Sequence, residues 1–587
     1  MRIRLLAMAV MAAFVALLPA PAHAAGGTSY TWIGSSQDPA ADNHSWTDAR
    51  NWSPNGVPGN GDSVSIAQPN GTHCTAHVDD VPTVTLAGFR LLQTPDLCGT
   101  SINGGQITVT GTFTWDGGVL NTATTVAAGA AGTIGGTNGE LDVLSQNLDV
   151  GGTLGLSGLP GTSTTPGDPG TPALRIVNPF VLHVLPGGTL TSTGDNKVNF
   201  LSCCNNPARI TNEGTVAVDG GTFEVDAVAF DQDGTISASN GGRLLSTAAP
   251  VTAGDGASYE GSGSWTIHDH SHAVLSGTQM LGPDFHLELG TPEDQAGGTL
   301  QGTAVLEGTG TFDWSGTTIE AALTVAHGVT LRASGEPPNN GRRILAGMDG
   351  SVPTPLTVHG RFVVDDGAVI GTGVHSLIEI ASDGTLSLAP GSSINGDSCC
   401  VSPDQVVNHG TLVVPSGTGV ADIHNEALDS DGTISLADDA VVQANLGVTL
   451  SGGTLLGAGT VAADLDNVAG KVRPAGSGTG TLTVDGGYDQ GKRAELDVDL
   501  TAGAGDRLAV TGTATVGGRL AAHDAGGYHP RLKDVRTVLS AASVAGSLRC
   551  VTTSGAGSTG THAGHWQAKA SGRHVRLTWV DGRHTSC

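Results

Sequence analysis

Three histidines alternate within one stretch, His268-Asp-His270-Ser-His272, and form the densest imidazole cluster in the sequence. On a β-strand, side chains at i and i+2 point to the same face, and two imidazoles at that spacing are a common part of zinc sites. The run would extend about 13 Å along a strand, so at most two of its histidines could share one ion. His268 and His270 are therefore the candidate metal ligands, and a solvated strand is the alternative interpretation.

Adjacent acidic residues are the candidates for acid and base chemistry, and they occur at Asp79-Asp80, Asp365-Asp366 and Asp438-Asp439. Glycosidases use two carboxyl groups that flank one bond. Neighbours on a strand point to opposite faces, so such a pair could cooperate only at a turn, for which Asp365-Asp366-Gly367 is best suited. The sequence contains no H-E-x-x-H, G-x-S-x-G, phosphate-loop or C-x-x-C pattern. We therefore predict no catalytic residues and no cofactor, and enzymatic activity stays an open alternative.

The cysteines are a third set with its own chemistry: Cys74, Cys98, Cys203, Cys204, Cys399, Cys400, Cys550 and Cys587. An even number of cysteines in an exported chain points to disulfides, although connectivity cannot be read from sequence. The simplest arrangement joins Cys74 to Cys98, joins Cys550 to Cys587, and bridges each adjacent pair internally. We expect the two adjacent pairs at matching corners of two related half-rods, either as rigid corners or as strained bridges open to redox chemistry or ligand contact.

Short β-strands are the elements that must position these residues. Segments such as 106–115 and 222–225 alternate polar and apolar residues with a period of two, which indicates half-buried strands. Many strands follow a Gly-Thr pair, in which we expect glycine to take a left-handed conformation and threonine to start the strand. Gly410, Gly432 and Gly453 repeat every 21 or 22 residues, a spacing within the range of one β-solenoid coil.

The sequence also contains a long duplication. Ser202-Cys-Cys followed by Asn212-Glu-Gly-Thr returns as Ser398-Cys-Cys followed by Asn408-His-Gly-Thr. Together with the Gly-Thr period, this predicts an all-β, elongated β-solenoid with two related halves. A string of separate β-sandwich domains is the alternative.

The expected organisation has a signal peptide at 1–24, a Trp-rich N-terminal cap at 25–104, solenoid half 1 at 105–302, solenoid half 2 at 303–466 and a C-terminal β module at 467–587. Trp32, Trp46 and Trp52 favour a cap over the open end of the core, with a sugar-stacking platform as the alternative interpretation.

The first residues are typical of export. Arg2 and Arg4 precede an apolar run at 5–18 and an Ala22-His23-Ala24 cleavage site. About 14 apolar residues are too few for a transmembrane anchor, which needs about 20. The net charge of −28 disfavours nucleic acid as a partner. We therefore expect a secreted or surface-held protein that does not span the membrane.

The two ends carry a resemblance. The segments 480–484, 496–498, 506–520 and 537–539 resemble the final portion of autotransporter passenger domains, and the opening from Trp32 to Ile66 is similar to the start of related secreted bacterial β-helix proteins. The resemblance implies a right-handed parallel β-helix that acts in adhesion or at a surface, and it implies no catalytic residues. Autotransporters continue into a translocator β-barrel, whereas this sequence ends at Cys587, so simple export is the expectation.

Two functions follow as hypotheses. The first is a structural or adhesive protein whose face binds a polysaccharide or cell-envelope polymer without turnover. The second is a β-helix enzyme, either a lyase or a glycoside hydrolase, that degrades polysaccharide. The sequence leaves the ligand and the oligomeric state open.

Overall fold

The computed structural model describes residues 27–34, 44–67, 77–92, 100–135, 142–157, 174–201, 208–268, 270–290, 298–334, 343–345, 355–373, 376–396, 404–476, 478–555 and 564–582. The predicted signal peptide lies outside these ranges. Within them, every element except one turn of 3-10 helix, η2 (Ala49–Asn51), is a β-strand, which confirms the all-β prediction. None of the helical residues described could cross a membrane. The chain divides into two compact units, Met1–Gly155 and Leu156–Cys587, and each is described by itself.

Unit 1 contains a short antiparallel pairing followed by parallel strands. β1 pairs with β2 in antiparallel fashion, and β3, β5, β6 and β8 follow one another in parallel. The strands are β1 (Ser29–Trp32), β2 (Trp52–Ser53), β3 (Ser63–Ala67), β4 (His77–Val81), β5 (Val84–Leu92), β6 (Ser101–Asp116), β7 (Gly118–Val126), β8 (Ala131–Ile134), β9 (Asp142–Leu144) and β10 (Leu148–Val150). β11 (Thr153–Ser157) spans the boundary of the two units in the sequence.

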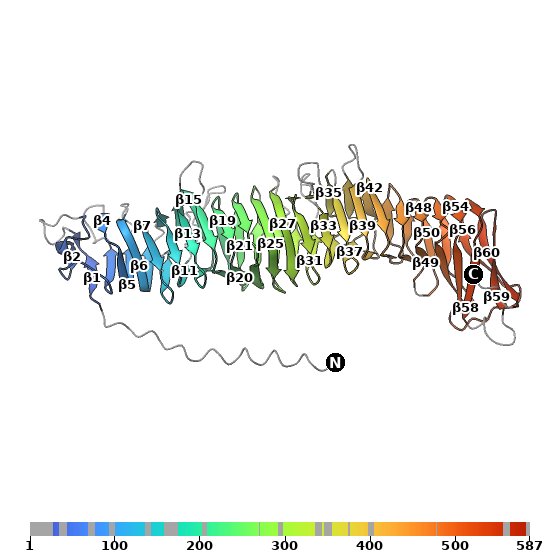
Figure 1. Cartoon of the computed structure of the whole chain (residues 1–587), viewed down its shortest axis with the longest axis horizontal. Coiled ribbons are helices and arrows are strands. Elements are labelled where there is room, and N and C mark those ends of the chain that lie inside the picture. Colours follow the sequence, from blue (N-terminus) through green and yellow to red (C-terminus); the bar gives the residue numbers. More distant parts are fainter. Residues whose placement is uncertain are drawn as a thin grey trace. The chain divides into compact units, whose positions relative to one another are not determined.

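Unit 2 is built from three ladders of parallel strands, here called A, B and C, which the chain visits in turn (Figure 1). Ladder A contains β13 (Val181–Val184), β16 (Arg209–Asn212), β19 (Ala229–Gln232), β22 (Pro250–Ala253), β25 (His272–Leu281), β27 (Thr299–Gly308), β29 (Thr318–Ile319), β32 (Arg343–Leu345), β35 (Val369–Thr372), β38 (Ser393–Gly396), β41 (Ala421–His424), β44 (Val441–Ala444), β47 (Thr460–Ala462), β50 (Thr481–Val484), β53 (Arg507–Val510) and β56 (Val535–Ser540).

Ladder B contains β14 (Thr189–Thr193), β17 (Thr215–Asp219), β20 (Thr235–Ser239), β23 (Ala257–Gly261), the second parts of β25 and β27, β30 (Ala322–Val325), β33 (Pro355–Val358), β36 (Leu377–Ile380), β39 (Asp404–Asn408), β42 (Glu426–Ser430), β45 (Val448–Leu450), β48 (Leu465–Asn467), β51 (Tyr488–Gln490), β54 (Thr513–Val516) and β57 (Ser543–Gly546).

Ladder C contains β12 (Leu174–Val177), β15 (Asn196–Leu201), β18 (Thr222–Asp226), β21 (Arg243–Thr247), β24 (Ser264–Ile267), β26 (His286–Leu289), β28 (Thr311–Trp314), β31 (Thr330–Ala333), β34 (Arg361–Val364), β37 (Thr385–Leu388), β40 (Thr411–Val414), β43 (Thr433–Leu436), β46 (Thr454–Gly457), β49 (Lys471–Pro474), β52 (Glu495–Leu500), β55 (Arg519–Asp524) and β58 (Cys550–Gly555).

The core of unit 2 lies on the inward faces of these ladders. Along ladder C, aromatic and aliphatic side chains alternate from strand to strand, as in Phe223, Leu244, Trp265, Leu287 and Phe312, and all five are fully buried. Alternating large and small side chains lets successive layers interdigitate, and each buried aliphatic side chain contributes about 1.5–3 kcal/mol. The period-two alternation of the sequence therefore arises from one buried and one exposed face on each strand.

The Asn-x-Gly-Thr motif forms a tight turn between two ladders. The buried Asn212 side chain donates from Nδ2 to the backbone oxygen of Thr235 at 3.0 Å, and Asn408 does the same to Thr433 at 3.0 Å. At Gly214, a Cβ atom would lie 2.4 Å from the carbonyl oxygen of Gly188, and Gly410 is similarly crowded. Neither glycine has a positive φ. The predicted left-handed conformation is therefore wrong at these two turns, where glycine is required by close backbone approach.

The duplicated segments lie on different ladders. Asn212 ends β16 on ladder A, whereas its counterpart Asn408 ends β39 on ladder B. Counting along ladder A, β38 is the eighth strand after β16, and β39 is the next strand of the chain. Trp265 on ladder C and its counterpart Val461 on ladder A show the same shift. The copies are thus displaced by eight full passes through the ladders plus one strand, so the predicted matching corners are wrong.

The last strands change direction. β60 (His574–Asp581) runs antiparallel to β56, and β59 (Gly564–Ser571) runs antiparallel to β60. The inner face of this hairpin buries Trp566 and Trp579, whose rings meet edge to face at 5.2 Å. The predicted domain boundaries stay a prediction, although β6 runs through the boundary at 104/105 and β27 through the one at 302/303.

Candidate functional site

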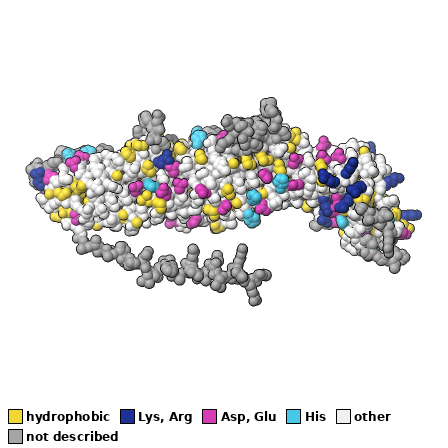
Figure 2. Space-filling model, viewed as in Figure 1, with side chains coloured by type: hydrophobic (Ala, Val, Ile, Leu, Met, Phe, Trp, Pro, Cys, Tyr) yellow, Lys and Arg dark blue, Asp and Glu magenta, His cyan; other side chains and the backbone are white. Residues whose placement is uncertain are grey.

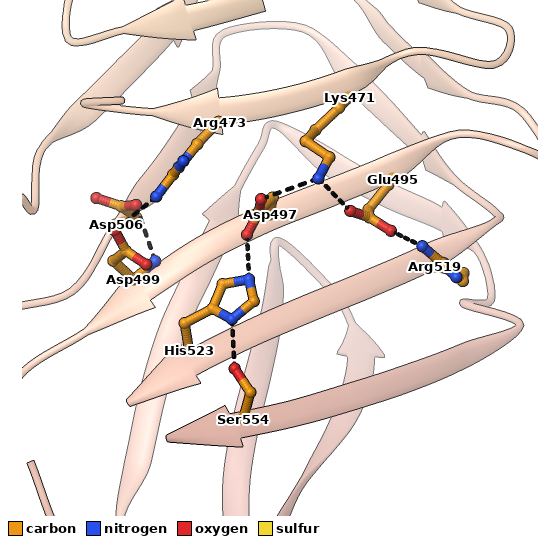
Figure 3. A network of polar contacts seen from close by, with 9 residues as sticks. All are labelled: Lys471, Arg473, Glu495, Asp497, Asp499, Asp506, Arg519, His523 and Ser554. Carbon is orange, nitrogen blue, oxygen red and sulfur yellow. Dashed lines mark hydrogen bonds and ion pairs between the residues drawn. The ribbon is translucent and has the colours of Figure 1, made fainter. Parts of the chain in front are cut away.

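The densest polar network in the described part of unit 2 lies on the outward face of ladder C (Figure 3). We call it the ion-pair lattice, and its members are Lys471, Arg473, Glu495, Asp497, Asp499, Arg519 and His523. The alternation of β52 produces it, because Glu495, Asp497 and Asp499 point outward while Leu496 and Val498 are buried in the core. β49 on one side and β55 on the other supply the cations.

Strand register sets the contacts of the lattice. Lys471 is opposite Glu495, which is opposite Arg519. The Lys471 Nζ atom lies 3.0 Å from Glu495 Oε1 and 3.3 Å from Asp497 Oδ2, and Arg519 donates to Glu495 Oε2. These pairs lie between strands about 4.8 Å apart, so every outward carboxylate of β52 can reach cations on its neighbouring strands.

Two further contacts complete the lattice. Arg473 Nη2 lies 3.2 Å from Asp499 Oδ2, and His523 Nε2 lies 2.7 Å from Asp497 Oδ1. The carboxylate side chains are only 6–12 % exposed, whereas the cationic side chains are 38–52 % exposed. The cations therefore lie over the carboxylates and separate them from water.

Protonation states follow from this geometry. Hydrogen bonding to Glu495 raises the pKa of Lys471, and hydrogen bonding to Asp497 raises the pKa of His523. Burial alone would raise the pKa values of Glu495 and Asp497, but the hydrogen bonds and charges of their cationic partners outweigh burial and hold both pKa values below their usual range. The lattice is therefore fully ionised when the imidazole is protonated.

Asp506 supports the end of β52 from inside. Its fully buried carboxylate accepts the backbone N–H groups of Gly480 and Asp499, each at 2.9 Å. Burial raises the pKa of Asp506 to about 6, although both N–H groups act in the opposite direction. This carboxyl group fixes the backbone beside Asp499 and does not face a surface where a substrate could bind.

One part of the lattice has the form of a catalytic relay. Ser554 Oγ lies 2.5 Å from His523 Nδ1, and the other imidazole nitrogen contacts Asp497. A hydroxyl, an imidazole and a carboxylate in this order could generate a nucleophile. Elsewhere, however, His77 contacts Ser101 at 2.5 Å and His272 contacts Thr299 at 2.7 Å, again between directly opposed residues. The His523–Ser554 contact thus follows from strand register and does not by itself indicate catalysis.

The predicted metal ligands do not share a strand. β24 ends at Ile267, the backbone N–H of Ser271 donates to the His268 carbonyl, and His270 has a φ of 60°. The histidines therefore follow a turn, and the assumed alternation on one strand face is wrong. No group of three or more metal-binding side chains occurs among the described residues. A site formed by His268 and His270 alone stays a prediction.

Asp365-Asp366 and Asp438-Asp439 lie at turns, whereas Asp79-Asp80 lie within β4, where the pairing register shifts. None of the three pairs brings two carboxylates together for catalysis in the part of the chain that the structure describes. Asp365 contacts Arg332 Nε at 2.7 Å, so the best candidate is already in an ion pair. Asp79 accepts a hydrogen bond from Asn103 at 2.9 Å, and both Asp80 and Asp439 have positive φ values. These contacts and conformations are those of structural turns at Asp365-Asp366 and Asp438-Asp439, and of an irregular strand at Asp79-Asp80.

The cysteine predictions fall mostly outside the described residues. Cys74, Cys98, Cys203, Cys204, Cys399, Cys400 and Cys587 all lie there. Cys550, at the start of β58, is disulfide-bonded. The segment with Cys203 and Cys204 connects ladder C to ladder A, whereas the segment with Cys399 and Cys400 connects ladder A to ladder B. The proposed pairings stay predictions.

The three tryptophans of unit 1 form a core. Trp32, Trp46 and Trp52 are at most 3 % exposed, and Trp52 meets the other two edge to face at 4.9 and 4.8 Å. Trp52 Nε1 donates to the Trp46 carbonyl oxygen at 2.8 Å. Rings buried in this way cannot stack on a sugar, which removes the platform interpretation for these residues.

Two features escaped the sequence interpretation. In unit 1, Asp142 is fully buried and accepts the Gly117 N–H at 2.6 Å, and burial raises the pKa of this carboxyl well above its usual value. In unit 2, the lattice does carry a signal, because Lys471, Glu495 and Arg519 are spaced by 24 residues. Only strand register shows that this spacing equals one pass through the three ladders.

Comparison with known proteins adds no assignment, because the sequence matches no model of a protein family and no curated protein.

Proposed function

We propose that this chain is a secreted or cell-surface protein, folded as an elongated right-handed parallel β-helix, that binds a cell-envelope or environmental polymer without turning it over. The pairing of every third strand supports the β-helix part of the proposal. Small-angle scattering of the mature chain should give an elongated particle. A globular particle would contradict the β-helix.

The observation that carries the binding proposal is an uncharged, regular face on ladder C. We call it the threonine face, and it consists of the outward Thr385, Ser387, Thr411, Val413, Thr433, Ser435, Thr454 and Leu456. Thr385, Thr411, Thr433 and Thr454 are directly opposed in successive strands. Their hydroxyl groups repeat at about 4.8 Å.

A regular face of this kind suits a regular partner. Each threonine offers one methyl and one hydroxyl group, so an extended polysaccharide could meet the same two groups at every strand. Ladder B has comparable threonines at Thr215 and Thr235, but its face carries charge. Thr215 is followed in its strand by the outward Asp219, and Ser239, in the strand of Thr235, donates to the Asp219 carboxylate. Ladder C therefore offers the longer uncharged surface.

A glycan array with the mature chain tests this proposal. Replacing Thr411 and Thr433 with Gln should weaken binding at least tenfold, because the longer side chains disrupt the flat face. The matched control replaces Thr215 and Thr235 with Gln and should leave binding unchanged. Binding that is insensitive to the first pair, or absent for every glycan, contradicts the proposal.

A carbohydrate-modifying enzyme is the second candidate, and the Asp497–His523–Ser554 contact is the observation that favours it. Assays for reducing sugar, unsaturated product and ester hydrolysis decide between the two. Turnover that is lost in Ser554→Ala but retained in Thr552→Ala would replace the binding proposal with this one. The Asp365→Asn/Asp366→Asn variant examines the acid pair in the same assays, and turnover lost in it would place the catalytic carboxylates there.

A further inference from the structure

Positive charge is concentrated at one end of the sequence. Of the 26 basic residues, 14 lie within 467–587, together with only 9 of the 54 acidic residues. This segment therefore carries a net charge of +5 and the remainder −33. Figure 2 shows Lys and Arg side chains gathered over the C-terminal strands of unit 2 on the face in view. Such an asymmetry favours electrostatic contact between this segment and an anionic partner.

The antiparallel end of unit 2 exposes a cluster of these cations without carboxylate partners. We call it the basic patch, and it consists of Arg507, Lys569, Arg573 and Arg576. All four residues are exposed. Lys569 on β59 is directly opposite Arg576 on β60, which is in turn opposite Thr537 on β56. Arg507 donates to Ser540 Oγ at 2.7 Å, and Ser540 is opposite His574, the neighbour of Arg573.

Like charges directly opposed across two strands lower stability. Within the described residues, none of the four patch cations makes an ion pair, whereas every cation of the lattice does. The sheet therefore places a repulsive pair where a neutral residue would be more favourable. A partner that supplies negative charge would neutralise this repulsion, and the repulsion relieved would add to the free energy of binding.

We propose that the basic patch is a binding site for an anionic polymer of the cell envelope or its surroundings. The inference rests on the proposed function and adds a second site with a defined ligand chemistry. The positive charges of guanidinium and ammonium groups attract both carboxylates and phosphates. A guanidinium group can also bind either anion through two parallel hydrogen bonds. The shared chemistry is thus a repeating anion, either carboxylate or phosphodiester.

Binding of the mature chain to two immobilised polymers tests the site. Polygalacturonate supplies carboxylates, poly(glycerol phosphate) supplies phosphodiesters, and a neutral glucan serves as the reference. We expect binding to at least one anionic polymer that weakens at least tenfold between 50 mM and 500 mM salt, because exposed charges are screened. The preferred polymer identifies the anion. Equal binding to the neutral glucan, or no salt dependence, would overturn the proposal.

Charge-reversal variants locate the site. The triple variant Lys569→Glu/Arg573→Glu/Arg576→Glu should weaken anionic binding at least tenfold. The matched control, Lys492→Glu/Arg493→Glu/Arg549→Glu, changes the net charge by the same amount at three other exposed cations, and it should retain binding within twofold. Equal losses in both variants would show an effect of net charge alone and would overturn the site.

Folding and competing partners need separate readouts. The neutral variant Lys569→Gln/Arg573→Gln/Arg576→Gln should bind weakly yet melt at the temperature of the parent or slightly above it, since it removes a repulsion and no stabilising ion pair. Stronger binding to anionic lipid vesicles than to either polymer, or a patch-dependent dimer in sedimentation, would overturn the polymer as occupant. If the chain binds neutral glycans through the threonine face but no anionic polymer, this inference fails and the proposed function stands. If it binds nothing, both fail.

Discussion

The ion-pair lattice and the basic patch are both outward faces near the C-terminal end of unit 2, and they use positive charge in opposite ways. In the lattice, an acidic strand, β52, lies between the basic strands β49 and β55, so each cation meets a carboxylate. In the patch, β59 places Lys569 against Arg576 of β60. The order of strands thus decides whether charge stabilises the fold or stays available to a ligand.

This difference explains why the densest polar network is the weaker candidate for a ligand site. The lattice carboxylates are buried under their cations, and a ligand would have to displace partners that are already held at 2.7 to 3.3 Å. A ligand at the patch displaces no carboxylate partner among the described residues, and only Arg507 donates to a protein hydroxyl there, that of Ser540. Partnered charge therefore indicates stability, and unpartnered charge indicates recognition.

The largest expected effect breaks the lattice. Asp497→Asn should lower the local unfolding free energy of β52 and β55 by about 2–3 kcal/mol, because it leaves Lys471 and His523 without a shared, nearly buried carboxylate. Amide hydrogen exchange on these strands measures the loss. The exposed Asp466→Asn on β48 is the control, with a change below about 0.5 kcal/mol. Equal effects of the two substitutions would show that the lattice contributes nothing particular.

A smaller effect concerns the imidazole of the lattice. Because Asp497 raises the pKa of His523 in the folded state, protonated His523 stabilises the fold fully below its unfolded pKa of about 6.5, and this stabilisation is lost as pH rises through the raised folded pKa. The partly exposed imidazole should contribute roughly 0.5–1 kcal/mol. Denaturation at pH 5.5 and 8.5 should show the difference in the parent.

Two histidine variants isolate this contribution. His523→Gln should remove it from the comparison of the two pH values, whereas His272→Gln, which loses only a contact with the Thr299 hydroxyl, should keep it. The assignment would be contradicted if the difference in unfolding free energy between the parent and His523→Gln were the same at pH 8.5 as at pH 5.5.

The smallest expected effect comes from a substitution that gives the basic patch an ion pair like those of the lattice. Lys569→Glu places a carboxylate directly opposite Arg576 and should raise the unfolding free energy by about 0.5 kcal/mol. Gln567→Glu, opposite the uncharged Thr578, should have almost no effect. Thermal denaturation of the three proteins in low salt measures the difference, and a destabilised Lys569→Glu variant would mean that the opposed cations do not repel.

Local patterns allowed much of the fold to be predicted. Period-two alternation and Gly-Thr turns identified the strands, and the spacing of Gly410, Gly432 and Gly453 is indeed one pass through the ladders, since Thr411, Thr433 and Thr454 are directly opposed. The role of glycine was predicted wrongly at Gly214 and Gly410, although Gly453 does have a positive φ. At the first two turns glycine is required by crowding from a carbonyl group of a neighbouring strand, which is a tertiary effect. No local pattern distinguishes it from a left-handed turn.

The candidate sites were harder to predict, since they depend on register. β25 and β27 run through two ladders without a turn, so the number of strands per pass cannot be counted from turn residues alone. For the same reason the sequence alone could not predict that Lys471, Glu495 and Arg519 lie on one face. The alternating histidines were wrongly predicted to share a strand face, because His270 lies at a turn that the neighbouring sequence does not indicate.

The displacement of the two copies by eight passes and one strand bears on how such a chain can lengthen. A strand of this array needs only an apolar alternation and a neighbour in register, and ladders A, B and C all meet that requirement. A recombination event therefore need not insert a whole number of passes, since a copied segment can continue on whichever ladder comes next. The inherited segment then connects a different pair of ladders. A single genetic duplication can in this way diversify the exposed surface of the protein without changing one residue of the copied sequence.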